Sequence, residues 1–378
     1  MIVRSIKKQI DKALYKGKVV IIYGARRTGK TTLVKAILKE QEQSGKKNYY
    51  INCELLDAKR SLETTNEKLL KNYLGNNDIV VLDEAQNIEN IGLVLKIMVD
   101  TYPQIQIIAT GSSSFDLAGK ISEPLTGRNR AFILYPFSVL EIQNNAGFHE
   151  TSAQLSRALI YGMYPSVYSL PDQEAKLELM EIASSYLYKD ILTFEQIKNS
   201  KVLVELLALL ALQVGNEVSY TEIAQKLGVS NHTVKKYIDL LEKCFVVFSL
   251  RSFSRNLRNE INKSQKIYFY DLGIRNAIIQ NFNKLSLRTD LGALWENFCI
   301  IERLKYNQDR EIFANKYFWR MYSGPEIDYI EERDGQLACY EFKYSSGARV
   351  KRPTLFLEKY KPKSFTAVNS DNWFEFML

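Results

Sequence analysis

The first 110 residues alternate between short apolar runs and longer segments whose apolar positions recur at helical spacing. Residues 5–15 and 33–43 have the helical pattern, in which one face of the segment is apolar. Short apolar runs predict four strands, at residues 18–23, 48–52, 78–82 and 104–109. Strands that alternate with helices are typical of βαβ units, so we predict an α/β fold with a parallel sheet and helices on both faces.

The pattern changes after about residue 146. Residues 156–214 are helical almost throughout, and residues 219–270 predict two short helices followed by two strands. The last part predicts a helix, three strands, a helix and a strand, at residues 291–306, 317–322, 326–332, 337–343, 352–360 and 364–369. We therefore expect four parts: an α/β domain at 1–145, a helical connector at 146–215, a small helical module at 216–275 and a second α/β domain at 276–378.

A phosphate-binding motif lies between the first predicted strand and the helix after it. Residues 24–31, GARRTGKT, match G-x-x-x-x-G-K-[ST] without a mismatch. Lys30 would reach the β- and γ-phosphates, and the Thr31 hydroxyl would bind Mg²⁺, while backbone N–H groups and the helix N-terminus hold the phosphates. The residues expected to bind the nucleotide are Gly24, Ala25, Arg26, Arg27, Thr28, Gly29, Lys30, Thr31 and Thr32. Arg26 and Arg27 stand at variable positions of the pattern, so we assign them no separate role.

Two carboxylates follow the third predicted strand. Asp83 suits a direct or water-mediated contact with Mg²⁺, and Glu84 suits the base that orients or deprotonates the attacking water. The fourth strand runs into TGSSS at residues 110–114, where Ser112 or Ser113 could contact the γ-phosphate. A plain serine turn explains this last segment equally well. Together the motifs predict an ATP-hydrolysing site that uses Mg²⁺.

Composition excludes several classes of protein. Apolar residues make up 46% of the chain and charged residues 25%, which is normal for globular domains. The four cysteines form no CxxC pair and there are two histidines, which argues against a disulfide framework, a zinc site and a Ser–His triad. The longest apolar stretch, residues 202–214, is too short to span a membrane and contains Glu205. No signal peptide is visible at the N-terminus, so we expect a cytoplasmic protein without a membrane partner.

The module at 216–275 has the pattern of a winged helix. Ser219 and Ser230 are candidate N-caps of two helices that are separated by a short turn containing Gly228. The second helix buries a stripe of Val234, Ile238 and Leu241 and leaves four polar residues on its other face, Asn231, His232, Lys235 and Lys236. The two strands that follow frame a basic loop, with Arg251, Arg255, Arg258 and Lys263, as a wing.

The charge of this module favours contact with nucleic acid. The whole chain has a net charge of +8, and residues 226–288 alone hold 12 Lys/Arg and 4 Asp/Glu. Such an excess suits the release of counterions from phosphates. A module that only packs against the ATPase remains the alternative. Asp271, just beyond the second strand, has its simplest role as an N-cap of the next helix.

Carboxylates in the last part form the pattern Asp-x(n)-Glu-x-Lys on successive strands. Asp328 lies on one strand, Glu341 and Lys343 share a face of the next, and Glu296 lies on the preceding helix. This is the arrangement of restriction-endonuclease-like folds, in which Asp and Glu bind divalent cations and the lysine stabilises the nucleophile or the phosphate. We therefore expect a metal site of Glu296, Asp328 and Glu341, with Glu341 and Lys343 catalytic. A scaffold that binds without cutting is the alternative.

Several longer segments resemble one prokaryotic family of AAA-type P-loop ATPases. The segment "TGSSSFDL…LTGRNRAFILYPFSVLEI" follows the Asp83 strand, and "YFYDLGIRNAI", "GALWENFCI" and "EIDYIEERDGQLACYEFKYS" are similar to the companion domain of that family. The resemblance implies that Arg128 or Arg130 acts as an arginine finger or nucleotide sensor, although a solvated strand edge also explains them. It also maps the family's nuclease-like positions onto Glu296, Asp328, Glu341 and Lys343.

These inferences lead to one expected function and two alternatives. We expect ATP binding and Mg²⁺-dependent hydrolysis, coupled to the binding or processing of DNA. The first alternative is a nucleotide switch whose nuclease-derived last domain is a non-cleaving scaffold. The second is a signalling ATPase with a protein partner. A homo-oligomer is compatible with all three.

Overall fold

The computed structural model describes residues 2–112, 125–186, 200–255, 265–321 and 324–377. Two compact units make up the chain. The first unit is Met1–Tyr135 with Lys243–Phe245, and the second unit is Pro136–Glu242 with Val246–Leu378. Within the described parts of the chain, no helix is both long and apolar enough to cross a membrane.

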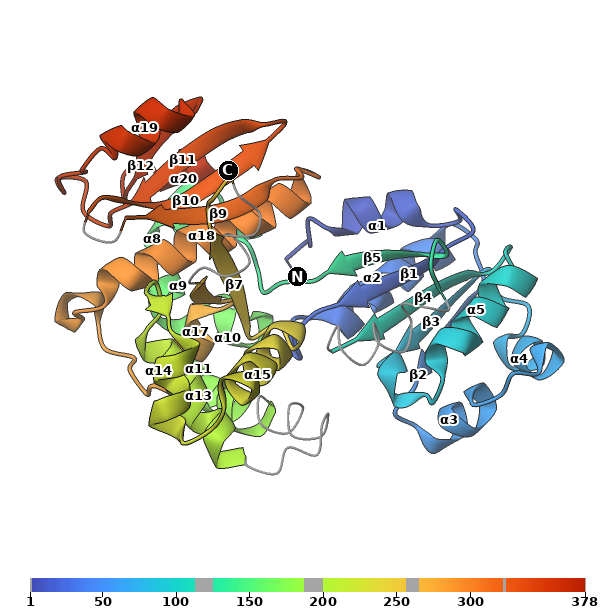
Figure 1. Cartoon of the computed structure of the whole chain (residues 1–378). Coiled ribbons are helices and arrows are strands. Elements are labelled where there is room, and N and C mark those ends of the chain that lie inside the picture. The colour runs from blue at the N-terminus through green and yellow to red at the C-terminus, as the bar shows by residue number, and fades with distance from the viewer. Residues whose placement is uncertain (1, 113–124, 187–199, 256–264, 322–323, 378) are drawn as a thin grey trace. The chain divides into compact units, whose positions relative to one another are not determined.

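The first unit is built on a five-stranded parallel sheet in the order β2-β3-β4-β1-β5 (Figure 1). The strands are β1 (Val19–Tyr23), β2 (Asn48–Asn52), β3 (Ile79–Asp83), β4 (Gln106–Gly111) and β5 (Asn129–Ile133). The helices are α1 (Lys7–Ala13), α2 (Lys30–Gln43), α3 (Leu56–Leu62), α4 (Glu67–Leu74) and α5 (Ile91–Thr101), with a 3₁₀ turn η1 (Ala85–Asn87). All four predicted strands are confirmed to within two residues, and β5 adds a fifth.

Burial explains why this sheet is central. Every residue of β1, β3 and β4 is buried, as expected for parallel strands with helices on both faces. On one face, Val20 and Ile22 of β1 share a core with Ile10 of α1 and Val34 of α2. The strands are parallel, so the carboxyl ends of β1, β3 and β4 lie on one edge, with β4 between the other two. Ligands bind at this edge in open α/β sheets.

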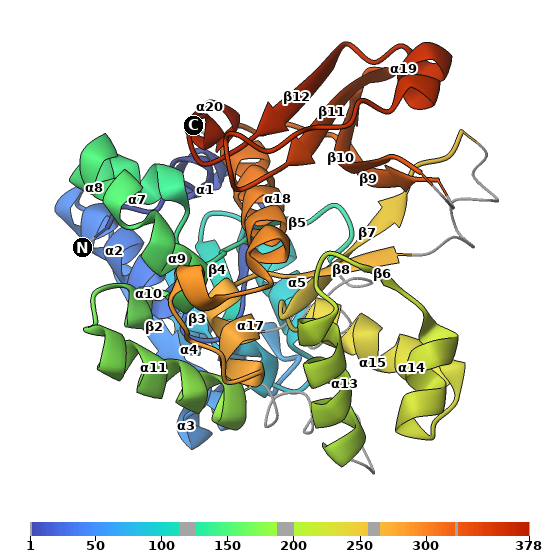
Figure 2. The same ribbon diagram turned by 90° about the vertical axis from the view of Figure 1, so that its left-hand side faces the viewer.

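The second unit begins with the helical region that the sequence predicts. Its elements are α7 (Val139–Ala146), α8 (Phe148–Ala153), α9 (Leu155–Tyr161), α10 (Pro165–Tyr168), α11 (Asp172–Glu181), a π-helical turn η2 (Ile182–Tyr186) and α13 (Ser200–Leu212). Figure 2 shows α13 beside α14 and α15. Leu203, Leu206 and Leu210 lie on the buried side of α13 and Leu212 on its exposed side.

A helix-turn-helix follows, as the pattern of caps and glycine predicts. Its two helices are α14 (Tyr220–Leu227) and α15 (Asn231–Lys243). The strand β6 (Glu217–Val218) precedes them, and β7 (Val247–Ser252) and β8 (Gln265–Phe269) follow. The Ser219 hydroxyl accepts a hydrogen bond from Glu222 N and caps α14. Gly228 ends α14 in the left-handed conformation, with a φ of 64°. In α15, Val234, Ile238 and Leu241 are buried, which confirms the predicted stripe.

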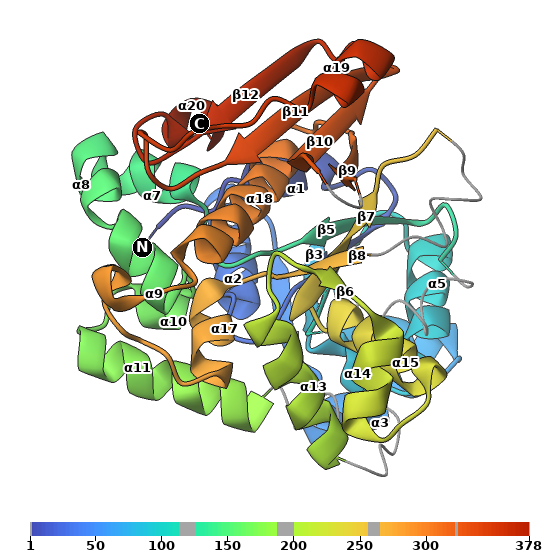
Figure 3. The same ribbon diagram turned by 60° about the vertical axis from the view of Figure 1, so that its left-hand side comes forward.

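The remaining elements complete a seven-stranded sheet in the order β12-β11-β10-β9-β7-β8-β6. Its further strands are β9 (Asn315–Arg320), β10 (Glu326–Arg333), β11 (Gln336–Phe342) and β12 (Ser364–Val368). The helical elements are α17 (Leu272–Ile278), η3 (Leu285–Leu287), α18 (Leu291–Asp309), α19 (Thr354–Tyr360) and α20 (Trp373–Met377). In Figure 3, α18 runs along the strands β9–β12.

One sheet contains strands from both sides of the expected boundary between residues 275 and 276. Strand β7 of the helix-turn-helix pairs in parallel with β9, through Arg251 with Tyr317 and Ser252 with Phe318. Phe253 N also donates to Phe318 O at 2.7 Å. One sheet therefore unites the parts that we expected to be separate. The pairing joins residues about 65 positions apart, which local periodicity does not reveal.

Two layers of side chains cover the strands β9–β12. Tyr340 of β11 faces Phe376 of α20 and Arg303 of α18 on one side. Cys339, the next residue along, belongs to a cluster with Phe356 of α19 on the other side. This alternation is the period of two expected of a strand covered on both faces.

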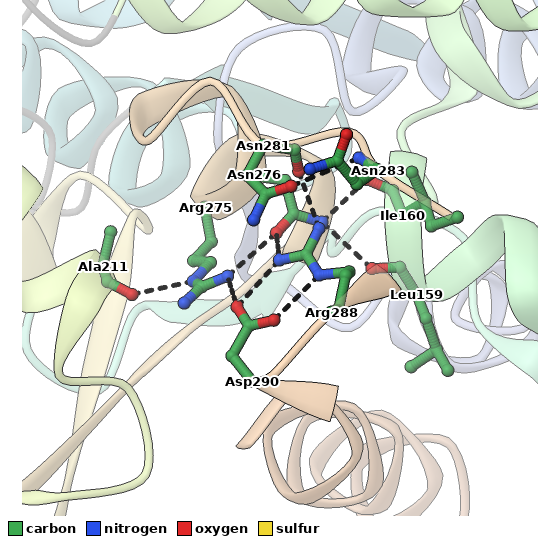
Figure 4. Close-up of polar contacts among 9 residues, drawn as sticks. All are labelled: Leu159, Ile160, Ala211, Arg275, Asn276, Asn281, Asn283, Arg288 and Asp290. Carbon is green, nitrogen blue, oxygen red and sulfur yellow. Dashed lines mark hydrogen bonds and ion pairs between the residues drawn. The ribbon is translucent and has the colours of Figure 1, made fainter. Parts of the chain in front are cut away.

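A buried polar network stabilises the junction of α9, α13, α17 and α18 (Figure 4). Arg275 donates to Asp290 Oδ2 at 2.5 Å and to the carbonyl of Ala211 at 2.8 Å, and Arg288 donates to both oxygens of Asp290. Asn276 donates to the carbonyls of Leu159 and Ile160. Although burial favours the neutral acid, the two guanidinium groups lower the pKa of Asp290 to about 2.

Candidate functional site

The phosphate loop connects the end of β1 to the start of α2. Gly24 lies so close to Leu134 that a Cβ atom would approach its carbonyl oxygen to 2.3 Å, so the position requires glycine. Gly29 precedes α2 with a φ of 93°, in a conformation that favours glycine. The Thr28 hydroxyl donates to Ala25 O at 2.8 Å and closes the loop on itself. The backbone is therefore folded as a cradle in front of a helix N-terminus, which suits a phosphate.

Lys30, the first residue of α2, is turned back into the loop. Its side chain is 4% exposed, and Nζ donates to the carbonyls of Gly24 and Ala25 at 2.9 and 3.0 Å. The ammonium group therefore lies within the cradle that the loop forms. Thr32 follows on an exposed position of α2, and Arg27 adopts a positive φ of 61° within the loop.

Asp83, at the end of β3, is the centre of a hydroxyl cluster. Thr31 Oγ1 and Tyr50 OH donate to its Oδ2 at 2.7 and 2.6 Å, and Thr110 Oγ1 donates to its Oδ1 at 2.5 Å. Asp83 is 3% exposed. Carboxylate and hydroxyl oxygens are ligands that Mg²⁺ prefers, so Thr31 and Asp83 fit the expected cation by their chemistry. Tyr50 and Thr110 are contacts that the motifs do not specify.

Glu84 is positioned by its backbone and by a glutamine. Its φ is 54°, and its N–H donates to Thr110 Oγ1 at 3.0 Å. Gln86 Nε2 donates to Glu84 Oε2 at 2.5 Å and to Ser112 Oγ at 3.2 Å. Gln86 therefore links the candidate base to Ser112, the residue after β4 and one of the two serines that the sequence left open. Ser113 lies outside the described residues.

Burial changes the acidity of two groups beside Asp83. Desolvation, followed by the hydrogen bond to Asp83, raises the pKa of Tyr50 above its usual range. Desolvation, with Asp83 and Glu84 adding to it, raises the pKa of the Cys53 thiol to about 12. Both groups are therefore neutral at physiological pH.

Arg4 is a further contact of the phosphate loop that sequence inspection missed. Its guanidinium group donates to the carbonyl of Thr28 at 2.8 Å and to that of Tyr135 at 2.5 Å. An arginine well outside the motif gives no local signal, because only the tertiary fold brings the segment before α1 to the loop.

Arg128 does not lie at the phosphate loop of its own chain. It precedes β5, and its carbonyl accepts from Val19 N at the start of β1, whereas the loop begins at the other end of that strand. Arg128 Nε binds Asp100 Oδ1 at 2.7 Å, and both side chains are about 40% exposed. Arg130 is exposed and its guanidinium lies 5.9 Å from the ring of Phe132. Within its own chain, Arg128 therefore lies at the end of β1 opposite to the phosphate loop.

The helix-turn-helix presents the polar face that the pattern predicts. Asn231, His232, Lys235 and Lys236 of α15 are exposed. Asn231 Nδ2 donates to Thr221 Oγ1 at 3.1 Å and joins α15 to α14. Arg251 is exposed on β7, while Arg255 binds Glu332 at 2.8 Å. Arg258 and Lys263 of the expected wing lie outside the described residues.

The charge count of this region overstates its surface charge. Lys266, Arg275 and Arg288 are each less than 10% exposed. Lys266 binds Glu296, and the two arginines bind Asp290, so three of the twelve cations are compensated inside the second unit. Among the described residues, the exposed cations of this window include Lys235 and Lys236 of α15 and Arg251 of β7.

Asp271 has the role that we expected. Its Oδ1 accepts from Ile274 N at 3.1 Å and caps α17, and its Oδ2 accepts from Met163 N at 2.7 Å. Complete burial is the largest influence on this carboxyl and raises its pKa to about 6.

The carboxylates expected to bind a metal, Glu296, Asp328 and Glu341, lie near one another. Lysine side chains lie beside them. Lys266 Nζ is 2.9 Å from Glu296 Oε1 and 4.0 Å from Asp328 Oδ1. Lys343 Nζ is 2.8 Å from Glu341 Oε1. Burial and then the charge of Glu296 raise the pKa of Asp328 well above its usual range. The buried Oε2 of Glu341 has no hydrogen-bond partner.

This arrangement does not fit the expected metal site. Among the residues that the structure describes, no three His, Cys, Asp or Glu side chains form a group that could hold a metal ion. The prediction that Glu296, Asp328 and Glu341 converge on a cation is therefore not supported. The physical reason is Lys266, a residue of β8 that the local pattern assigns to the basic module.

Comparison with known families divides the chain in three. Residues 16–143 match the family model described as an AAA domain. Residues 152–285 match a domain of unknown function (DUF8612), and residues 291–375 match another domain of unknown function (DUF4143). The AAA match contains the phosphate loop, Asp83 and Glu84.

Uncharacterized proteins of two organisms are similar to this chain over most of its length. An uncharacterized protein of Mycobacterium tuberculosis is 26% identical over 358 residues, covering 92% of this chain and 75% of its own length. An uncharacterized protein of Methanocaldococcus jannaschii is 25% identical over 371 residues, covering 91% of this chain and 79% of its own length.

Solved structures match this chain with low TM-scores. The structure of a DNA replication initiation factor is 17% identical, with a TM-score of 0.29, covering 63% of this chain and 86% of its own. The replication initiator DnaA bound to AMPPCP and single-stranded DNA is 14% identical, with a TM-score of 0.31, covering 64% of this chain and 90% of its own. The N-terminal part of this chain matches the AAA domain model and has a P-loop at the end of the first strand of a parallel sheet.

Proposed function

We propose that the first unit binds ATP with Mg²⁺ and hydrolyses it, and that its nucleotide state controls DNA binding by the helix-turn-helix of the second unit. The observation that carries the ATPase part is the hydrogen bond from Thr31 to Asp83, beside the buried ammonium of Lys30. It joins the two halves of a nucleotide site from sequence positions 52 residues apart.

Binding of the triphosphate would rest on the loop. Lys30 exchanges its bonds to the carbonyls of Gly24 and Ala25 for the β- and γ-phosphate oxygens, while loop N–H groups and the N-terminus of α2 stabilise the negative charge. Thr31 and Asp83 would hold Mg²⁺, which supplies neutralisation of the charge that develops on the phosphates.

Hydrolysis would rest on Glu84. Its carboxylate accepts a proton from the attacking water as the bond from that water to the γ-phosphorus forms and the bond to the β,γ-bridging oxygen breaks. Gln86 holds one oxygen of this carboxylate and also contacts Ser112. A γ-phosphate near Ser112 would therefore affect Gln86, the side chain that orients Glu84.

DNA binding would rest on α15. Lys235 and Lys236 stand on its exposed face with His232, at the spacing of neighbouring positions on a helix. The second helix of a helix-turn-helix enters the major groove in DNA-binding members, and lysines on its flank bind phosphates.

A paired measurement tests both parts. ATP hydrolysis should fall sharply in Lys30→Ala, because the triphosphate loses its buried cation. DNA affinity of the unmutated chain should differ between ATP and ADP, and Lys30→Ala should abolish that difference without abolishing DNA binding. If Lys30→Ala hydrolysed ATP at the wild-type rate, the proposed nucleotide site would be wrong. Absence of DNA binding even at low salt would contradict the DNA part and favour a protein partner.

A further inference from the structure

Lys266 is a buried cation among the expected metal ligands of the second unit. It comes from β8, a strand of the helix-turn-helix segment, and is 2% exposed. Its Nζ lies 2.9 Å from Glu296 Oε1 on α18 and 4.0 Å from Asp328 Oδ1 on β10. One ammonium group therefore stands between two of the three carboxylates that a divalent cation would need to bring together.

Two of the carboxylate oxygens around Lys266 already accept hydrogen bonds from donors other than lysine. Tyr268, two residues along β8, donates to Glu296 Oε1 at 2.5 Å. Asp328 Oδ2 accepts from the backbone N–H of Phe342 at 2.8 Å. Oxygens that already accept from protein donors are poor candidates for a metal, which would have to displace those donors.

The third carboxylate has a lysine of its own. Glu341 Oε1 is 2.8 Å from Lys343 Nζ, and the Glu341 side chain is 7% exposed. Glu296, Asp328 and Glu341 thus face two ammonium groups within one buried cluster. Gly215 closes this region on another side, where a Cβ atom would stand 3.3 Å from Glu296 Oε2.

We propose that Lys266 is the resident counter-ion of this cluster, and that the cluster is a metal-independent joint between β8, α18 and β10 rather than a nuclease centre. A divalent cation would have to enter beside a buried ammonium group, and the repulsion between the two cations opposes this. The joint connects the helix-turn-helix to the rest of the seven-stranded sheet through a charge pair as well as through backbone bonds. This inference goes beyond the proposed function and does not depend on ATP hydrolysis.

Removing the lysine should create the metal site that the wild type lacks. A buried ion pair that loses one partner leaves an uncompensated charge and is strongly destabilising. In Lys266→Met, Glu296 and Asp328 would lack their shared cation, and Mn²⁺ could take the place of the ammonium group. The variant should therefore melt at a lower temperature than its parent and recover part of that loss when Mn²⁺ is added.

The experiment uses the full chain with Asp83→Asn as the parent, so that the phosphate loop does not contribute a cation site. Thermal melts with Mn²⁺ and with a chelator, and Mn²⁺ electron paramagnetic resonance, are measured for the parent, Lys266→Met and Lys266→Arg. The parent and Lys266→Arg should show neither a shift with Mn²⁺ nor bound Mn²⁺, and only Lys266→Met should gain both.

Lys316→Met serves as the matched control. Lys316 is a half-buried lysine of β9, and Glu331, its partner across the β9–β10 pair, already binds Arg303 and Arg333. Its loss should not create Mn²⁺ dependence.

Two measurements keep the inference falsifiable if Lys266→Met does not fold. Stoichiometric Mn²⁺ binding by the parent that disappears in Glu341→Gln would overturn it. Nicking of supercoiled DNA by the unmutated chain with Mn²⁺, lost in the same Glu341→Gln variant, would overturn it as well. Loss of ATPase activity in Lys30→Ala bears only on the proposed function, so the two failures are distinguishable.

Discussion

Thr31 Oγ1 donates a hydrogen bond to Asp83 Oδ2 at 2.7 Å and thereby joins the phosphate loop to the end of β3. The pair spans β4, which lies between β1 and β3 in the sheet. Because Tyr50 and Thr110 donate to the same carboxylate, three hydroxyl groups orient Asp83. The predictions for the first unit follow from this arrangement.

Asp83→Asn should reduce kcat for ATP hydrolysis by about 100-fold or more, because the site loses the anion that would hold Mg²⁺. Raising the Mg²⁺ concentration should restore part of the rate. Steady-state hydrolysis at several Mg²⁺ concentrations checks this. Tyr50→Phe is the matched control, since it removes one donor to Asp83 and keeps the carboxylate, and it should leave kcat within about tenfold of wild type.

Glu84→Gln should lower kcat by about 10²–10⁴-fold with little change in KM. The reason is that replacing the carboxylate by an amide removes the proton acceptor while the shape of the side chain is preserved. The variant should still bind ATP, which fluorescence titration with a labelled nucleotide can measure. Gln86→Ala should act more mildly, since it only removes a positioning contact to Glu84 and Ser112. A Glu84→Gln variant that hydrolyses ATP at the wild-type rate would show that another group prepares the water.

Lys235→Ala with Lys236→Ala should weaken DNA binding and reduce the slope of log affinity against log salt by about 2, because about two phosphate contacts are lost. The loss should be similar for different DNA sequences. Fluorescence anisotropy over a range of salt concentrations measures both. Lys226→Ala is the control, since that lysine lies on α14 and binds Glu222. Equal effects of the control and the double variant would indicate a general charge effect rather than a surface on α15.

Gly162→Ala should destabilise the second unit by more than about 2 kcal/mol, since a Cβ atom would meet the Asp271 carboxylate at 2.0 Å and φ is +70°. Gly147→Ala is the matched control, with a φ of +85° and no atom within 4 Å of the added Cβ. It should show backbone strain alone, of about 1 kcal/mol. Urea unfolding compares them. Similar losses in both variants would mean that the contact with Asp271 relaxes without much effect.

The sequence pattern predicts those features of the fold that depend on interactions between neighbouring residues. The strands β1 to β4, the cap of Ser219 on α14 and the glycine turn at Gly228 all follow from neighbouring residues, and the structure has them where they were predicted. Asp271 caps α17 for the same reason.

Long-range pairings and the contacts of long side chains were not predictable in this way. Arg128 stands at the far end of β1 from the phosphate loop because β5 runs parallel to β1, and its own sequence context contains no sign of this. Arg4 lies just before the helix predicted at residues 5–15, and only the fold brings it to the loop. Arg275 and Arg288 are counted with a basic surface in the sequence, but in the fold both are buried and bind Asp290.

The sequence by itself determined the phosphate loop, the parallel sheet behind it and the helix-turn-helix, because glycine positions, strand periodicity and helix caps are properties of short segments. Only the tertiary structure decided which charges meet. Lys266 illustrates the difference: within β8 it is one more cation of a basic module, and in the fold it lies between Glu296 and Asp328. The reason is that burial and the pairing of charges depend on elements far apart in the chain, and these set the chemistry that each carboxylate can perform.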